Sequence, residues 1–206
     1  MNRLEKFSTI FLVAGLTFFL VALTSLGLAP AMMTSAVPDD GGLPQKIPDE
    51  FKVYYKTIPE YHEALLKGRD IYVKEACWHC HSQYVRPVGS ESMYYGAIST
   101  PGELETVLQR PQLLGTRRVG PDLSREAGKR TNDWHFAHLY NPRATTPGSV
   151  MPSYTWYFDS TTTPPTPTDE GVALVAYLQN LGFWVKDGKR TYHDLNEITL
   201  PPFRED

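Results

Sequence analysis

The chain has 206 residues, which is enough for one modest globular domain with additional segments. Its 20 Lys and Arg residues nearly balance its 23 Asp and Glu residues, and this excludes the basic surface of a nucleic-acid-binding protein. Seventeen prolines and 15 glycines predict a loop-rich domain rather than a long helical bundle. We therefore expect a single compact domain, no nucleic acid among its partners, and function in its local motifs.

The first predicted element is a membrane anchor. Residues 8–29, STIFLVAGLTFFLVALTSLGLA, carry no charge and as a helix would span a hydrocarbon core of about 30 Å. A cleaved signal peptide is the alternative, but its apolar part is typically about 7–15 residues long. Basic residues precede the run and Asp39 and Asp40 follow it, which predicts a cytoplasmic N-terminus and an exported remainder. Residues 1–36 are thus expected to be a cytoplasmic stub and a transmembrane anchor.

The next segments are a linker and a helix. Residues 37–58 hold three prolines and a glycine pair, which is typical of a linker. A helix is predicted from Pro59, because proline suits the first turn, and it is expected to run directly into the cysteines. Tyr61, Leu65, Gly68 and Tyr72 recur along it at near-helical spacing.

The rest of the chain is expected to be irregular up to a terminal helix. Short helices are predicted near 102–109 and 132–140, and residues 160–168 read as a stiff extended loop. In the terminal helix Thr168 is the predicted N-cap and Gly182 the predicted C-cap. A polar tail, 184–206, follows, and no strand is predicted.

The chemistry of the chain centres on its only two cysteines. Cys77 and Cys80 are separated by two residues, and His81 follows at once. Two thiols at this spacing can add to the two vinyl groups of haem, and the histidine then ligates the iron, so the motif predicts one haem c. A thioredoxin-like pair would need a strand before the motif, and a zinc site would need a second pair of ligands.

A second iron ligand must come from elsewhere in the chain. Methionine and histidine are the usual choices. Met151 is the preferred candidate because Pro152 stiffens the loop that would hold a weak thioether bond. Other candidates remain open: Met93, His135, His138 and His193.

Two further roles can be assigned around a haem. The other ring nitrogen of His81 needs an acceptor, and the Pro121 carbonyl in VGPDL is the candidate. Haem propionates need donors or positive charges. The candidates, which sequence cannot rank, are Arg86, Arg143 and Tyr154, together with Arg117, Arg118, Arg130 and Trp156.

These motifs resemble those of class I cytochromes c. Gly68 and Tyr72, with Leu174, Tyr177 and Leu178, resemble the crossing terminal helices of that family. The GPDL and MPSY segments resemble its loops on the two sides of the haem. The resemblance implies an all-α fold, in which residues 59–183 would form a monohaem cytochrome c domain behind the single transmembrane helix.

A closer resemblance is to the monohaem subunit of the cbb3-type cytochrome c oxidases. It rests on CWHCHSQYVRPV, on RRVGPDLSREAGKRTNDWHFAHLYNPRATTPGSVMPSY and on the N-terminal span. The resemblance implies a bacterial inner membrane location with the haem domain on the periplasmic side. It also implies a haem–copper catalytic subunit as electron acceptor, and a dihaem cytochrome c subunit or a soluble cytochrome c as donor.

Three alternatives stay open at this point. The monohaem subunit of a nitric oxide reductase has the same layout, although HSQYVRP and the block DWHFAHLYNPR, with its histidines His135 and His138, argue against it. An anchored electron shuttle would need a longer flexible linker. A thiol–disulfide oxidoreductase would carry no covalent haem.

Overall fold

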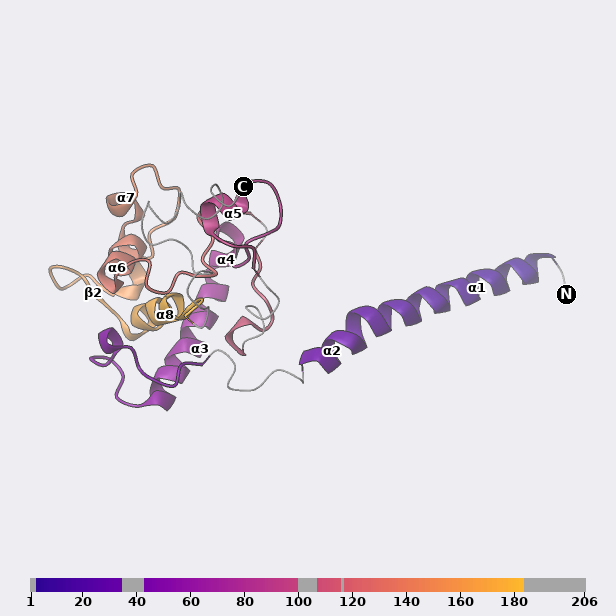
Figure 1. Cartoon of the computed structure of the whole chain (residues 1–206), viewed down its shortest axis with the longest axis horizontal. Helices are drawn as coiled ribbons and strands as arrows, with labels where there is room; N and C mark the ends of the chain where they lie inside the picture. The colour runs from indigo at the N-terminus through magenta and orange to yellow at the C-terminus, as the bar shows by residue number, and fades with distance from the viewer. Residues whose placement is uncertain (1–2, 35–42, 100–106, 116, 184–206) are drawn as a thin grey trace. The chain divides into compact units, whose positions relative to one another are not determined.

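The structure is a computed structural model that describes residues 3–34, 43–99, 107–115 and 117–183 (Figure 1). The chain divides into two compact units, residues 1–41 and 42–206. In the described ranges the elements are helices and helical turns apart from one short pair of strands, so the all-α prediction is confirmed. In chain order the elements are α1 (Arg3–Ala22), η1 (Leu23–Leu28), α2 (Ala29–Thr34), η2 (Asp49–Phe51), α3 (Ile58–Lys74), α4 (Cys77–Cys80), α5 (Glu91–Tyr95), η4 (Val107–Gln109), α6 (Asn132–Tyr140), α7 (Pro142–Thr145), η5 (Thr155–Tyr157), β1 (Phe158–Asp159), β2 (Thr166–Pro167) and α8 (Asp169–Asn180).

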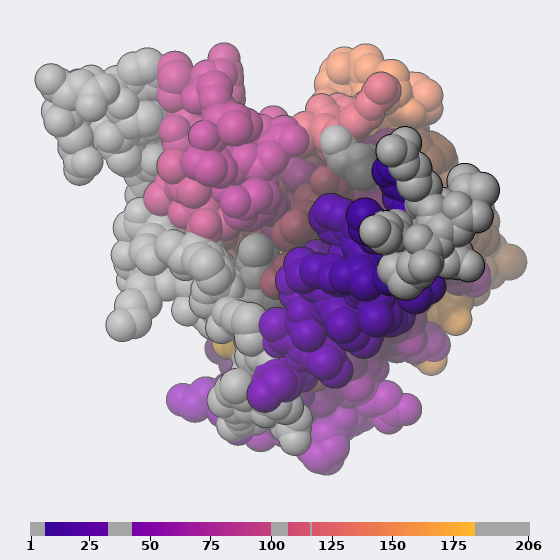
Figure 2. Space-filling model, turned by 90° about the vertical axis from the view of Figure 1, so that its right-hand side faces the viewer, coloured from indigo at the N-terminus to yellow at the C-terminus, as the bar shows by residue number. Residues whose placement is uncertain are grey.

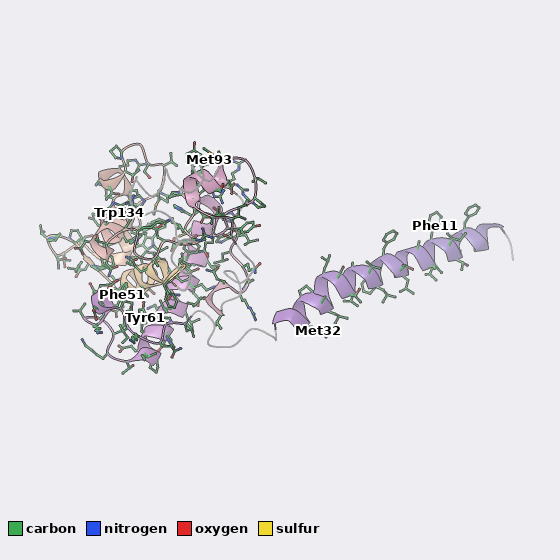
Figure 3. All side chains as sticks on the ribbon, viewed as in Figure 1. Phe11, Met32, Phe51, Tyr61, Met93 and Trp134 are labelled. Carbon is green, nitrogen blue, oxygen red and sulfur yellow. The ribbon has the colours of Figure 1, made fainter. Side chains whose placement is uncertain are left out.

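The N-terminal unit is one helix made of α1, η1 and α2. Its stretch Phe7–Met32 is 26 residues long and is apolar enough to cross a membrane. Large side chains stand out all around it, and Phe11 and Phe18 are 73% and 76% exposed (Figure 3). A helix that is apolar on every side suits lipid rather than water. The apolar run predicted to be an anchor is therefore helical, and the apolar helix is slightly longer than the uncharged run 8–29.

The anchor contains a wide turn before its proline. The turn η1 is π-helical, and the N–H of Ala29 donates to the carbonyl of Thr24 five residues earlier. Pro30 has no N–H to give, so the ordinary pattern of i to i−4 bonds is broken beside it. The hydroxyls of Thr24 and Ser25 donate to the carbonyls of Leu20 and Val21, at 2.8 and 2.7 Å. These bonds give the two carbonyl oxygens hydrogen-bond donors, which lipid chains could not supply.

The second unit is built on the crossing of α3 and α8 (Figure 1). A Cβ atom added to Gly68 would lie 2.0 Å from the carbonyl oxygen of Ala173, so no larger residue fits there. One turn further, the rings of Tyr72 and Tyr177 pack with their centroids 5.4 Å apart. Both tyrosines are about 1% exposed or less. The predicted crossing is confirmed.

Residues that precede α3 pack against it. Phe51 is fully buried, and its ring centroid lies 5.8 Å from that of Tyr61 on α3 (Figure 3). The carbonyl of Pro44 lies 2.8 Å from Nε2 of His62. Part of the segment between the anchor and α3 thus belongs to the hydrophobic core of the second unit.

The two ends of α3 have different causes. Thr57 and Glu60 form a capping box, and Pro59 occupies the first turn, as the sequence predicts. The prediction that the helix runs directly into the cysteines is wrong. It ends at Lys74, and Ala76 adopts a left-handed conformation with φ 56° before α4 begins. This turn sets α4 in a new direction.

The later helices follow their local signals. α6 has the predicted bounds, and its N-cap Thr131 accepts the N–H of Trp134. α8 is capped by Thr168, and its C-cap is Leu181, one residue before the predicted Gly182; the φ of 77° at Gly182 is the left-handed geometry common just after a C-cap. The prediction of no strands is wrong by one short antiparallel pair, β1 with β2. Residues 100–106 of the predicted 102–109 helix and the whole predicted tail, His193 included, lie outside the described residues.

Candidate functional site

The candidate site begins where α4 ends. α4 carries Cys77 and Cys80, and its C-cap is His81. Nδ1 of His81 lies 2.9 Å from the carbonyl oxygen of Pro121. A carbonyl can only accept, so Nδ1 holds the hydrogen and Nε2 keeps a lone pair for a metal. Burial lowers the pKa of His81 and the Pro121 bond opposes this, and the net lowering favours the neutral ring that ligation requires.

The ring of His81 packs against the backbone of Gly120. A Cβ atom added at Gly120 would lie 2.3 Å from Cε1 and 2.7 Å from Nδ1 of the ring. The N–H of Gly120 donates to the carbonyl of Cys80 at 3.0 Å. The glycine of GPDL is therefore required by the close approach of the imidazole.

The two cysteines are not disulfide-bonded, and their environment is not that of a redox pair. Burial, and then the charge of Glu75, raise the pKa of Cys77 to about 12. A thiol–disulfide oxidoreductase needs a reactive thiolate with a lowered pKa. The helix α3, and no strand, leads into the motif. These features favour attachment of a group to the cysteines over disulfide exchange.

The loop of Met151 leads to the same place. Met151 is half-buried and packs against the hydrophobic core, and its N–H donates to Oγ of Ser149 at 3.2 Å. Three residues later Tyr154 is buried, and its phenol contacts the Cys77 thiol. Burial, and then Cys77, raise the pKa of Tyr154. The structure thus brings Tyr154, predicted only as a propionate partner, to a cysteine.

The other methionine and histidine candidates have surroundings of their own. Met93 lies on α5, half-buried, and His135 is buried on α6 with Nε2 3.7 Å from Oε1 of Glu126. His138 is half-buried on α6, and burial, followed by the charge of His81, lowers its pKa. However, Nδ1 of His138 lies 2.6 Å from the Thr145 hydroxyl, and its ring stacks on Trp134. His138 is therefore held by two contacts of its own.

The candidate propionate partners differ in whether they already contact another side chain and in how exposed they are. Arg86 pairs with Glu91. Arg118 is almost buried and pairs with Glu91 and Asp122. The guanidinium of Arg130 lies over the ring of Trp134, 5.2 Å from its centroid. Arg130 is also exposed, as are Arg117, Arg143 on α7 and Trp156 on η5.

Sequence reasoning missed the carboxylates that hold these arginines. Asp122 is 2% exposed and accepts from the Ser82 hydroxyl at 2.7 Å and from the Tyr84 N–H at 2.9 Å. Glu91 joins the network from α5. The spacing of four between Arg118 and Asp122 was the one available signal, and it is too common to be read alone.

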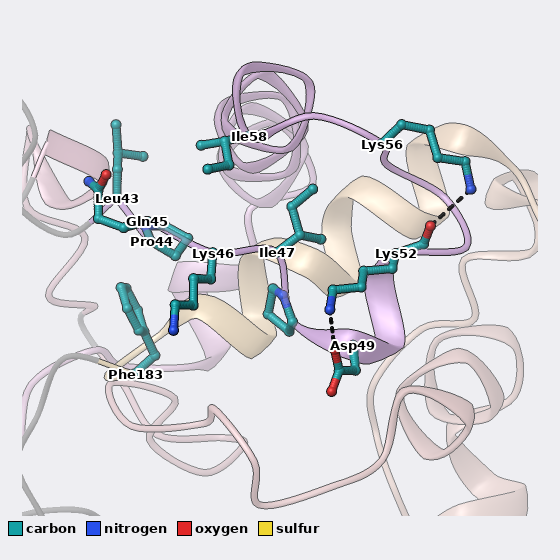
Figure 4. Close-up of a pocket in the computed structure, with 11 residues that line it drawn as sticks. Leu43, Pro44, Gln45, Lys46, Ile47, Asp49, Lys52, Lys56, Ile58 and Phe183 are labelled. Atoms are coloured by element: carbon teal, nitrogen blue, oxygen red, sulfur yellow. Dashed lines mark hydrogen bonds and ion pairs between the residues drawn. The ribbon is translucent and has the colours of Figure 1, made fainter.

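A separate hollow of about 850 Å³ lies on the segment that precedes α3 (Figure 4). Its rim carries Lys46, Lys52 and Lys56, and its apolar part includes Ile47 and Phe183. Asp49 pairs with Lys52. None of the predicted site residues lines this hollow.

The residues around His81 fit a haem c on the evidence of their chemistry. Two free thiols stand at the right spacing, the imidazole presents Nε2, and a glycine leaves room for the ring. A thioether sulfur and a buried phenol come from the segment Met151–Tyr154.

The comparisons with known proteins agree with this chemistry. A family model described as "Cytochrome C oxidase, mono-heme subunit/FixO" matches residues 3–170. No curated protein matches the chain. The matched range covers most of the chain and includes the helix Phe7–Met32, the motif at Cys77 and Met151. The chain therefore belongs to the mono-haem, or FixO, family of cytochrome c oxidase subunits.

Proposed function

We propose that this subunit carries electrons, one at a time, to the haem–copper catalytic subunit of a cbb3-type oxidase. The observation that carries the proposal is His81, held by the Pro121 carbonyl with Nε2 left for iron, directly after two free cysteines. The donor would be a dihaem cytochrome c subunit or a soluble cytochrome c. The electrons would serve the reduction of oxygen to water in the catalytic subunit.

Each residue has a defined part in this proposal. Haem, when bound, supplies a one-electron couple. Cys77 and Cys80 would hold it through thioethers, and His81 and Met151 would ligate the iron. A site with two protein ligands leaves no open position for oxygen, which suits transfer rather than oxygen activation. Methionine as one ligand favours a high potential. Pro121 fixes the ring of His81 and makes it a stronger ligand.

The surroundings of the site support the same reading. Tyr154 packs on Cys77 and keeps water from that side of the attachment. Arg86, Arg143 and Tyr154 remain the proposed propionate partners. The domain boundaries proposed for this function are an anchor over 1–36, a linker over 37–58 whose later part packs on the core through Phe51, a haem domain over 59–183 and a tail over 184–206. The anchor would hold the haem domain on the periplasmic face of the bacterial inner membrane.

The test uses the full chain extracted from native membranes in mild detergent. Haem content, copper and the reduced-minus-oxidised spectrum are measured on the complex that survives. Haem c together with haem b and copper is the expected result. Haem b with non-haem iron and no copper would reassign the chain to a nitric oxide reductase, and haem c alone would make it a shuttle.

A second measurement addresses the attachment itself. The mass of the denatured chain is expected to exceed the mass of the polypeptide by one haem. A chain that loses its haem on denaturation would refute the thioether bonds, and a chain without haem would refute the whole proposal.

A further inference from the structure

Two chain segments on the His81 side of the site are joined along their length. The N–H of Gly120 donates to the carbonyl of Cys80, and the N–H of Leu123 donates to the carbonyl of Ser82 at 2.8 Å. The His81–Pro121 bond lies between these two backbone bonds. The position of the Pro121 carbonyl therefore depends on how firmly residues 80–84 and 118–124 are held together.

The buried carboxylate of Asp122 also joins these two segments. Asp122 accepts from the Ser82 hydroxyl and the Tyr84 N–H on one oxygen, and from the Ser124 N–H at 2.9 Å on the other. The Ser124 hydroxyl donates to it as well. A buried carboxylate is costly unless its charge is compensated. Arg118 supplies a positive charge beside it, with Nη2 3.5 Å from Oδ2 of Asp122.

The guanidinium of Arg118 binds both segments. Its Nε donates to the Ser82 hydroxyl at 2.5 Å, and Nη2 donates to the Tyr84 carbonyl. Nη1 pairs with Glu91, and the guanidinium lies over the ring of Tyr95, 4.6 Å from its centroid. The side chain is only 8% exposed. The segment around α5, which belongs to the magenta-pink surface in Figure 2, is thus tied to the same residue.

We propose that Arg118 is a positioning residue for His81. It clamps residues 82–84 to Asp122 and so holds the Pro121 carbonyl against Nδ1 of the ring. This inference rests on the proposed role of His81 as an iron ligand. A firm bond to Nδ1 makes the imidazole a better electron donor, which stabilises the oxidised iron. Loosening the clamp should therefore raise the reduction potential.

The test compares Arg118→Gln with Arg118→Lys and Arg69→Gln in the full chain. Arg118→Gln loses both the charge and the forked geometry, and Arg118→Lys keeps only the charge. Arg69 is the matched control, because its guanidinium also bridges loop carbonyls, those of Leu108 and Pro111, which lie outside residues 80–84 and 118–124. Ser82→Ala is a milder probe of the same clamp, since it removes the hydroxyl shared by Arg118 and Asp122.

Covalent haem is measured first, and then the midpoint potential. We expect haem to be retained and the potential of Arg118→Gln to rise, by about tenfold in the electron-transfer equilibrium, or about 59 mV for one electron. Arg118→Lys should give part of this rise, Ser82→Ala a smaller one, and Arg69→Gln none. Unchanged potentials in the three clamp variants, or an equal shift in Arg69→Gln, would overturn the inference. Absence of haem in the unmodified chain would instead refute the proposed function.

Discussion

The two loops that carry the proposed iron ligands are held in different ways. The His81 side has a ladder of backbone bonds, a buried carboxylate and a buried arginine. The Met151 loop is fixed mainly at its ends, where the Met151 N–H donates to Ser149 and the Tyr154 N–H donates to the Leu139 carbonyl at 2.8 Å. His81 is thus held by many hydrogen bonds along its segment, whereas Met151 lies on a short loop with few hydrogen bonds. We therefore expect substitutions near His81 to reduce haem loading and unfolding temperature more than substitutions near Met151 do.

The strongest change is removal of both thiols. Cys77→Ala with Cys80→Ala should abolish covalent haem, because no other cysteine exists in the chain. The measurement is the mass of the denatured chain. Met151→Ala is the control from the other loop, and it should keep its covalent haem. Haem that stays attached in the double variant would contradict the proposed bonds.

Gly120→Ala should be the most damaging single change. The new methyl group would lie 2.3 Å from Cε1 of His81, so the ring or the loop must move. Overpacking of this kind costs about 1–3 kcal/mol. We expect a lower yield of haem-loaded chain and a lower unfolding temperature.

The matched control for that change lies on the other loop. Pro152→Ala adds no atoms beside a ring and should alter the unfolding temperature only slightly. Equal effects of the two variants would remove the contrast between the loops.

Met151→His should change the potential without unfolding the domain. Methionine raises the potential of a haem relative to histidine, and axial ligands set potentials over a range of about 0.8 V. We expect a fall on the order of 0.1 V with covalent haem retained. Redox titration of the purified complex measures it. A potential equal to that of the unmodified chain would exclude Met151 as the ligand, and His138 would then be the next residue to test.

The smallest predicted effect concerns acid stability. Burial opposes ionisation of Glu91, but its bonds to Arg118 and Arg86 outweigh this and lower its pKa from 4.5 to about 2. A lowered pKa in the folded state means that Glu91 stabilises the fold fully above pH 4.5. This contribution is lost as the pH falls from about 4.5 to about 2.

Glu91→Gln isolates that contribution. The variant should be less stable than the unmodified chain at pH 7, and the gap should close as the pH falls through this window. Unfolding temperatures measured at a series of pH values give the comparison. A gap that stays constant would show that the Glu91 charge does not stabilise the fold.

Local signals gave a large share of the fold and of the site. The capping residues Thr57 and Thr168, the glycine Gly68 and the motif at Cys77 each act within a few residues, or through a pattern that sequence displays. The bond from His81 to Pro121 was foreseeable because both ends belong to recognisable motifs.

What sequence could not give depends on contacts between distant segments. Glu91 meets Arg118 across 27 positions, and neither residue stands in a pattern that points to the other. The left-handed turn at Ala76 was also missed, because alanine favours helices and here the surrounding packing overrides that preference. The wide turn η1 in the anchor has the same character, since proline and two hydroxyl residues had to be read together.

That wide turn has a geometric consequence for any helix that packs against the anchor. A π-helical turn inserts one additional residue, which rotates all that follows by about 100° relative to an unbroken helix. The residues of α1 that face one partner would therefore not be continued on the same side of the helix beyond Leu23, and the residues of α2 that follow would face another direction. A partner helix could contact the anchor over its whole length only by crossing it obliquely. Crosslinking at successive positions should therefore show that the contacting face of the anchor changes between Ala22 and Ala29.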